Sequence, residues 1–147
     1  MNRQDHGREL LAWDTPVRRG VLHEERHEQL RTQAQALGWD YVEADLVGCE
    51  TKEDLLVEIA SALDFPVWFG GNWDALFDCL ADLSWRAAPG RVLALRNLED
   101  LQSVAPEVLD TLVAILEDVA AVWQRRGQPL RVWVDLVGAD GGKAVRQ

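Results

Sequence analysis

The sequence predicts an α/β domain in which a small three-stranded parallel sheet is packed with helices. Three short apolar segments have the pattern of strands, at residues 41–46, 91–95 and 131–137. Segments with a helical spacing of apolar residues lie between them, and strands joined through helices pair in parallel by right-handed crossovers. The chain of 147 residues has the length of one domain and can bury roughly two-thirds of its unfolded surface.

Residues 1–38 are predicted to form an N-terminal extension that packs on the same domain. Residues 1–20 carry Asp, Arg, Gly and Pro and few clustered apolar side chains, which indicates a loose or weakly docked segment. Residues 21–23 are interpreted as a short strand. A helix is expected over 24–37, because its apolar stripe has helical spacing and Gly38 can cap its C-terminus.

The main part of the domain is predicted to span residues 39–137. After the strand at 41–46, Thr51 and Asp54 have the spacing of a capping box at the start of a helix. That helix ends before Pro66, because the residue before a proline is pushed away from helical geometry. The remaining elements are expected to be a loop at 68–71, a helix from the N-cap Asn72 to Leu83, a strand at 91–95, a helix over 106–126 capped by Gly127, a strand at 131–137 and a polar tail over 138–147.

The acidic side chains are concentrated in one part of the chain. The sequence has 25 acidic and 15 basic residues and a formal net charge of −10. Between Lys52 and Arg86 lie seven acids and no Lys, Arg or His, so this window holds −7 of the −10. Such a charge argues against nucleic acid or an anionic membrane as a direct partner and favours a basic protein.

Composition also bounds the class of protein. No apolar run approaches the roughly 20 residues that span a bilayer, and residues 1–10 are too polar for a signal peptide. Cys49 and Cys79 are too few for a disulfide scaffold and lack metal-ligand spacing. Cys79 is expected on the core side of its helix, and Cys49, in a loop after Gly48, is expected to be an exposed thiol. A cytoplasmic protein is expected.

The helix after Asn72 separates into two faces at 100° per residue. The apolar face consists of Leu76, Leu80 and Leu83. The opposite face consists of Asp74, Asp78 and Asp82, and Phe77 lies at the border. Like charges at positions i and i+4 destabilise a helix by about 0.2–0.5 kcal/mol per pair, and no lysine relieves them here.

The loop before this helix places Trp68 and Phe69 beside Gly70 and Gly71, where large aromatic side chains need not be buried. Aromatic residues next to unpaired carboxylates are typical of a protein interface that faces basic groups. The alternative interpretation is a solvated outer helix face, with one or both aromatic side chains folded back under the helix.

The segment from Phe65 to Leu80, Phe-Pro-Val-Trp-Phe-Gly-Gly-Asn-Trp-Asp-Ala-Leu-Phe-Asp-Cys-Leu, resembles the signature of the barstar family, intracellular inhibitors of the bacterial ribonuclease barnase. The resemblance extends to Leu83, and the order of predicted elements over 39–137 also matches that family. It implies a barstar-like fold and a protein that binds a basic bacterial ribonuclease or related toxin one-to-one, blocking its phosphate-binding site. It implies no catalysis and no cofactor, and a monomer is expected.

The resemblance also implies roles for individual residues. Asp78 takes the place of an RNA phosphate, and Asp74 pairs with further basic groups. Trp68 packs on the catalytic histidine of the nuclease, and Phe77 lies at the contact edge. The partner-binding residues expected from the resemblance and from the acidic face are Trp68, Gly70, Gly71, Asn72, Asp74, Phe77, Asp78 and Asp82.

The chain departs from the family pattern in several places. A glutamate that barstar uses late in the helix before its last strand falls near Val122 here, and the residues matching Trp68 and Phe77 are Tyr and Trp in barstar. Residues 1–38 have no counterpart in barstar itself. A different nuclease, or another toxin with a cationic active site, is therefore an alternative target. The alternative function is a regulatory or assembly module without a nuclease target.

Two enzymatic patterns carry less weight than the inhibitor pattern. The run from His23 to His27 matches the H-E-x-x-H zinc-protease motif, with Glu43 as a distant third ligand, but its charged neighbours favour a solvated helix start. Asp74 and Asp78 have a separation compatible with the acid/base pair of a glycosidase, but they lie on a convex helix and not in a cleft. We therefore expect no enzymatic activity and no bound metal.

Overall fold

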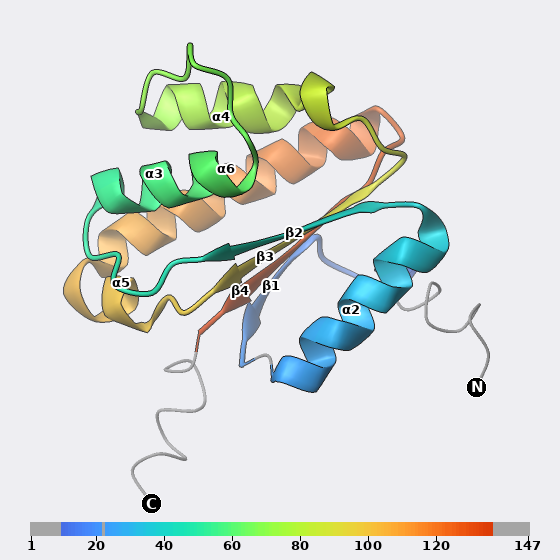
Figure 1. Cartoon of the computed structure of the whole chain (residues 1–147), viewed down its shortest axis with the longest axis horizontal. Helices are drawn as coiled ribbons and strands as arrows, with labels where there is room; N and C mark the ends of the chain where they lie inside the picture. Colours follow the sequence, from blue (N-terminus) through green and yellow to red (C-terminus); the bar gives the residue numbers. More distant parts are fainter. Residues whose placement is uncertain (1–9, 22, 137–147) are drawn as a thin grey trace, which may run out of the picture.

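Four parallel strands form the central sheet of the computed structural model, which describes residues 10–21 and 23–136 (Figure 1). Their order across the sheet is β1-β4-β3-β2. The strands are β1 (Val17–Gly20), β2 (Asp40–Asp45), β3 (Arg91–Arg96) and β4 (Leu130–Asp135). One row of paired residues runs across all of them and consists of Val17, Val132, Leu93 and Val42. The predicted α/β class and parallel sheet are confirmed.

The prediction of three strands is wrong, because β1 adds a fourth. β1 lies within residues 1–20, the segment predicted to be loose or weakly docked. The strand expected at 21–23 is also wrong, since Val21 lies outside any strand and His23 is the N-cap of the following helix. The physical reason is that β1 is a four-residue edge strand with one buried side chain, Val17, so it has no alternating apolar pattern.

Helices cover both faces of the sheet (Figure 1). One face is covered by α3 (Lys52–Ala62), α4 (Trp73–Asp82), α5 (Glu99–Val104) and α6 (Pro106–Arg125), and the other by α2 (Glu24–Leu37). A 3-10 turn, η1 (Ser84–Arg86), follows α4. The predicted helices are confirmed. The short elements α5 and η1 were not predicted, because six and three residues hold too little periodicity to detect.

Side-chain caps begin two of these helices as predicted. The hydroxyl of Thr51 accepts a hydrogen bond from the N–H of Asp54 at 3.0 Å. The side-chain oxygen of Asn72 accepts one from the N–H of Ala75 at 2.8 Å. Each cap satisfies a backbone N–H that has no partner inside its own helix, and so determines where the helix starts.

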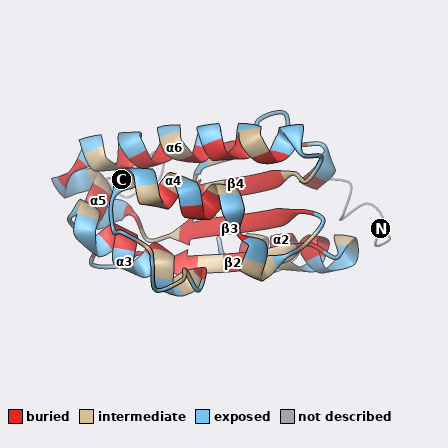
Figure 2. Ribbon diagram, turned by 90° about the horizontal axis from the view of Figure 1, so that it is seen from above, coloured by how far each residue is buried: buried red, intermediate tan, exposed pale blue. Residues whose placement is uncertain are grey.

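Apolar side chains fill both faces of the sheet. The larger cluster lies between the sheet and helices α3 to α6. The smaller cluster lies on the α2 side and consists of Leu10, Trp13, Leu30, Ala34, Trp39 and Val92. β3 and β4 are consequently buried along almost their whole length, as Figure 2 shows in red.

Within the described residues, no helix combines the length and apolar character needed to cross a membrane. Several predictions fall on other residues. The polar tail over 138–147, Val137 at the end of the last predicted strand, and residues 1–9 of the extension all lie outside the described part of the chain.

Candidate functional site: an acidic helix and an aromatic loop

α4 turns one face to the core and the opposite face to solvent. The buried face consists of Leu76, Cys79 and Leu80. The exposed face consists of Asp74, Asp78 and Asp82. Phe77 is partly buried and packs against the main core, so only part of its ring is accessible. The separation into an apolar and an acidic face, predicted from helical spacing, is confirmed.

The three aspartates of α4 have no internal counter-charge: among the described residues, none of them forms an ion pair or a side-chain hydrogen bond. Asp64, at the end of α3, differs, because it pairs with Arg86 at 2.7 Å. The nearby cation Arg126 donates to the carbonyl of Ala81, not to an aspartate. The negative charge of this face is therefore uncompensated and available to a cationic partner.

The loop between α3 and α4 exposes one aromatic side chain and buries another. Trp68 is 60% exposed, and its ring packs edge-on against Trp85 of η1 with centroids 6.5 Å apart. Phe69 is partly buried against the core, with its ring 5.0 Å from Phe65. The indole N–H of Trp85 donates to the carbonyl of Leu63 at 2.9 Å. The alternative interpretation, in which an aromatic side chain of the loop folds back against the protein, is therefore correct for Phe69 and wrong for Trp68.

Two glycines lead from this loop into α4, and they differ in their backbone requirement. Gly71 has a φ of 72°, in the left-handed region that strains residues with a side chain. Gly70 lies outside that region, and a Cβ there would meet Asn72 Nδ2 at 3.6 Å and Ala75 Cβ at 3.7 Å, which are ordinary contacts. Of the two glycines, Gly71 is therefore the one whose backbone conformation favours glycine.

The site lies inside the segment that matches a known family. The sequence profile described as Barstar (barnase inhibitor) matches residues 39–135. The chain belongs to the barstar family. Proteins of this family are inhibitors and not enzymes. A comparison with curated proteins found no significant match.

The barstar-family segment contains β2, β3, β4 and helices α3 to α6, whereas β1 and α2 precede it. β1 pairs with β4 at one edge of the sheet, and α2 packs on the face opposite α4 (Figure 1). The N-terminal elements of this barstar-family chain therefore complete the sheet and its second core at a distance from the acidic helix.

Sequence reasoning missed Trp85 as part of the site. It stands three residues after Asp82, beyond the predicted helix, and only the folded chain brings it against Trp68. The contact of Trp123 with α4 was also missed: its indole N–H donates to the carbonyl of Leu80 at 2.8 Å. An isolated tryptophan in the sequence carries no signal for either contact.

The two histidines of the H-E-x-x-H match do not come together. His23 is exposed, but His27 is fully buried, with its Nδ1 3.5 Å from the Tyr41 hydroxyl and its Nε2 3.5 Å from Asp135 Oδ2. The prediction of a solvated helix start is therefore wrong for His27, since it faces the sheet. Glu43 binds arginines of α2 and β3. Over 10–21 and 23–136, no three His, Cys, Asp or Glu side chains are arranged to hold a metal ion.

Both cysteines are buried. The prediction that Cys49 is an exposed thiol is wrong: it is 3% exposed and belongs to the main core. The turn immediately before Cys49 is stabilised by a hydrogen bond to α5, in which the N–H of Gly48 donates to Asp100 Oδ2 at 3.2 Å. Burial raises the pKa of Cys49 to about 11 and also raises the pKa of Cys79. At neutral pH the Cys49 thiol is therefore protonated and a poor nucleophile.

The free energy of unfolding is expected to fall as the pH drops below about 6.5, with His27 as one cause. Burial lowers the pKa of His27, Arg96 lowers it further, and Asp135 and Glu43 offset this only in part. His27 therefore binds a proton less readily in the folded state than in the unfolded state. The free energy of unfolding consequently decreases as the pH falls toward the pKa of His27 in the folded state. For one proton the slope is at most about 1.4 kcal/mol per pH unit.

Urea unfolding at several pH values between 5 and 8 measures this contribution. His27→Gln should have a shallower dependence on pH than the wild-type chain, because glutamine does not titrate. His23→Gln, at an exposed position, is the control and should keep the wild-type slope. An unchanged slope in His27→Gln would show that His27 titrates alike in both states.

Proposed function

We propose that this barstar-family protein inhibits a basic bacterial ribonuclease by placing α4 and the loop before it in the phosphate-binding active site of the nuclease. The main support is the outer face of α4, where three aspartates are exposed and have no internal cationic partner among the described residues. A carboxylate presents two oxygens to a guanidinium group much as a phosphate does. An acidic helix can therefore occupy a site built to bind RNA phosphates.

Each aspartate has a place in this proposal. Asp78 lies in the middle of the exposed face and takes the position of an RNA phosphate. Asp74 lies one turn before it, and Asp82 one turn after it, so both face basic groups at the border of the same pocket. Because no lysine or arginine within residues 10–21 and 23–136 pairs with them, their charge is available to a partner on binding.

The loop supplies the remaining contacts. Trp68 packs on the catalytic histidine of the nuclease, and the exposed part of Phe77 lies at the edge of the contact. Gly70, Gly71 and Asn72 hold the turn that joins the loop to α4. The large exposure of Trp68 supports this role. Because its ring already packs against Trp85, little side-chain mobility would be lost on binding.

The proposed complex is one-to-one, forms in the bacterial cytoplasm from a monomer of this protein, and involves no cofactor, nucleic acid or membrane. Charge complementarity should raise the association rate, and this rate should fall as salt screens the attraction. Another toxin with a cationic active site would be recognised by the same chemistry.

Inhibition of RNA hydrolysis by barnase tests the proposal. Titration with this protein should reduce the activity to the background level at a one-to-one ratio, and the protein alone should not cleave RNA. Full nuclease activity at a tenfold excess of the protein, together with no binding by calorimetry, would contradict inhibition of a barnase-type enzyme. That result would favour the alternative function, a barstar-like module without a nuclease target.

A further inference from the structure

The short turn η1 joins the two parts of the proposed binding surface. It follows α4 directly, because Leu83 ends that helix with a φ of 46°, in the left-handed region. Trp85 of η1 contacts Trp68 of the loop before α4, although the whole of α4 lies between them in the sequence. The end of the acidic helix and the aromatic loop therefore meet at Trp85.

The exposed ring of Trp68 is oriented by a neighbouring ring and not by a hydrogen bond. It stands at 88° to the ring of Trp85. Among the residues that the structure describes, none accepts a hydrogen bond from the indole N–H of Trp68. Because 60% of this side chain is exposed, few buried contacts restrict it, and its edge-on packing against Trp85 favours one orientation over the others.

Trp85 itself has a fixed position in the free protein. Its indole N–H donates to the carbonyl of Leu63 at 2.9 Å. Its ring stands at 86° to that of Phe65, with centroids 6.1 Å apart, and the side chain is partly buried against the main core. Phe65 in turn packs against Phe69. Trp85 is therefore ordered by its own contacts and can orient Trp68.

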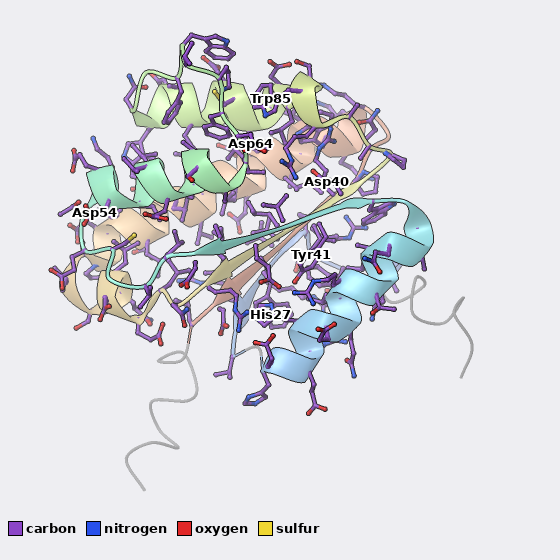
Figure 3. All side chains as sticks on the ribbon, viewed as in Figure 1. His27, Asp40, Tyr41, Asp54, Asp64 and Trp85 are labelled. Carbon is purple, nitrogen blue, oxygen red and sulfur yellow. The ribbon has the colours of Figure 1, made fainter. Side chains whose placement is uncertain are left out.

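Arg86, the next residue, attaches η1 to the sheet and to the base of the loop. Its guanidinium group donates two hydrogen bonds to the carboxylate of Asp40, at 2.8 and 3.2 Å, and one to Asp64 at 2.7 Å. Asp40 begins β2, and Asp64 lies between α3 and the loop. Figure 3 shows Trp85, Asp64 and Asp40 in the same region, between α4 and β2. These ion pairs hold η1 in place beneath the loop.

We propose, building on the proposed function, that Trp85 is a positioning residue for inhibition: it holds Trp68 in the exposed orientation in which Trp68 contacts the nuclease. Trp85 acts through Trp68 and not through a contact of its own. Because the orientation is set before the nuclease arrives, binding does not have to order this side chain, and the affinity is higher for that reason.

A double-mutant cycle with barnase as the probe tests this role. Trp85→Leu keeps an apolar side chain but removes the ring, and it should inhibit barnase about three- to tenfold more weakly than the wild-type chain, the effect of losing one aromatic pair. In the Trp68→Ala background the same substitution should change the inhibition constant less than about twofold, because the side chain that Trp85 orients is absent. Trp85→Phe restores a ring and should stay within about twofold of the wild type.

The matched control is Trp133→Leu, on the α2 side of the sheet. Trp133 is also partly buried, and its ring packs against another tryptophan, Trp13, with centroids 5.8 Å apart. Its indole N–H also donates to a backbone carbonyl, that of Gly20, at 3.1 Å. The folded fraction of Trp133→Leu should inhibit barnase as the wild type does, because this substitution leaves the contact with Trp68 intact.

A second measurement needs no substitution. Nuclear Overhauser spectra of the free wild-type chain should show contacts between ring protons of Trp68 and Trp85, because the two rings pack edge-on. Absence of these contacts would overturn the positioning role even if Trp85→Leu failed to fold.

The binding outcomes distinguish the role of Trp85 from the proposed function. Unchanged inhibition by Trp85→Leu, while the wild-type chain inhibits barnase, would overturn the positioning role and leave the proposed function in place. An equal loss in the wild-type and Trp68→Ala backgrounds would overturn it as well, because Trp85 would then act independently of Trp68. Equal weakening in Trp133→Leu would assign the loss to stability. Failure of the wild-type chain to bind barnase would contradict the proposed function, and with it any role of Trp85 in inhibition.

Discussion

Asp74→Ala/Asp78→Ala is expected to inhibit barnase on the order of 1000-fold more weakly than the wild-type chain. Both carboxylates are exposed in the free protein and would become buried against cationic groups of the nuclease. Removing one partner of a buried, hydrogen-bonded charge pair costs about 2–5 kcal/mol, and each 1.4 kcal/mol changes the affinity about tenfold. Two such losses account for the expected effect, which inhibition curves at fixed ionic strength would measure.

The matched control is Glu117→Ala/Asp118→Ala on α6. It removes the same formal charge from two exposed positions outside the acidic face, so it should change the inhibition constant only slightly. The salt dependence gives a second readout, because the association rate of the wild-type chain should fall more steeply with salt than that of Asp74→Ala/Asp78→Ala. Equal inhibition by the two double variants would mean that the overall negative charge of the protein, and not the acidic face of α4, determines the affinity.

Trp123→Ala is expected to lower the free energy of unfolding by about 3–5 kcal/mol, the usual loss for a large buried aromatic side chain. Trp123 is 4% exposed and lies in the main core. Its indole N–H donates to the carbonyl of Leu80, near the end of α4, at 2.8 Å. The guanidinium groups of Arg91 and Arg126 lie 4.2 and 4.7 Å from its ring centroids. This side chain therefore connects α6 to the acidic helix.

Chemical denaturation with urea measures the loss in the free energy of unfolding. The variant Trp123→Phe separates the contribution of the buried ring from that of the indole hydrogen bond. Phenylalanine keeps most of the buried ring but leaves the Leu80 carbonyl without its donor, so a smaller loss of about 1–3 kcal/mol is expected. Inhibition of barnase by the folded fraction of Trp123→Phe should be close to that of the wild type, because the aspartates remain in place. A loss below about 1 kcal/mol in Trp123→Ala would contradict its role as a core anchor.

Features that depend on neighbours in the chain could be predicted. The caps at Thr51 and Asn72 join atoms three residues apart, and both hydrogen bonds are present. The apolar and acidic faces of α4 follow from helical periodicity alone, because 100° per residue decides which side chains share a face. The barstar signature, which lies in the same local stretch, could be recognised for the same reason.

Features that depend on distant contacts could not be predicted. β1 was missed because a short edge strand depends on pairing with β4, more than 100 residues later, and not on its own pattern. Cys49 was assigned to solvent because it lies in a loop after Gly48, and His27 because charged residues surround it at the helix start, but both side chains are buried in the folded chain. Trp85 reaches Trp68 only because η1 and the loop after α3 meet in space.

By itself, the sequence determined the four longer helices, the parallel α/β class, the family and the acidic face of α4, because local hydrogen bonding and periodicity operate over a few residues. Tertiary structure alone decided which aromatic side chain of the loop stays exposed, how many strands complete the sheet, and whether the aspartates of α4 meet an internal cation. Those outcomes depend on which distant groups are brought within a few ångströms of each other, and the spacing of residues along a chain does not contain that information.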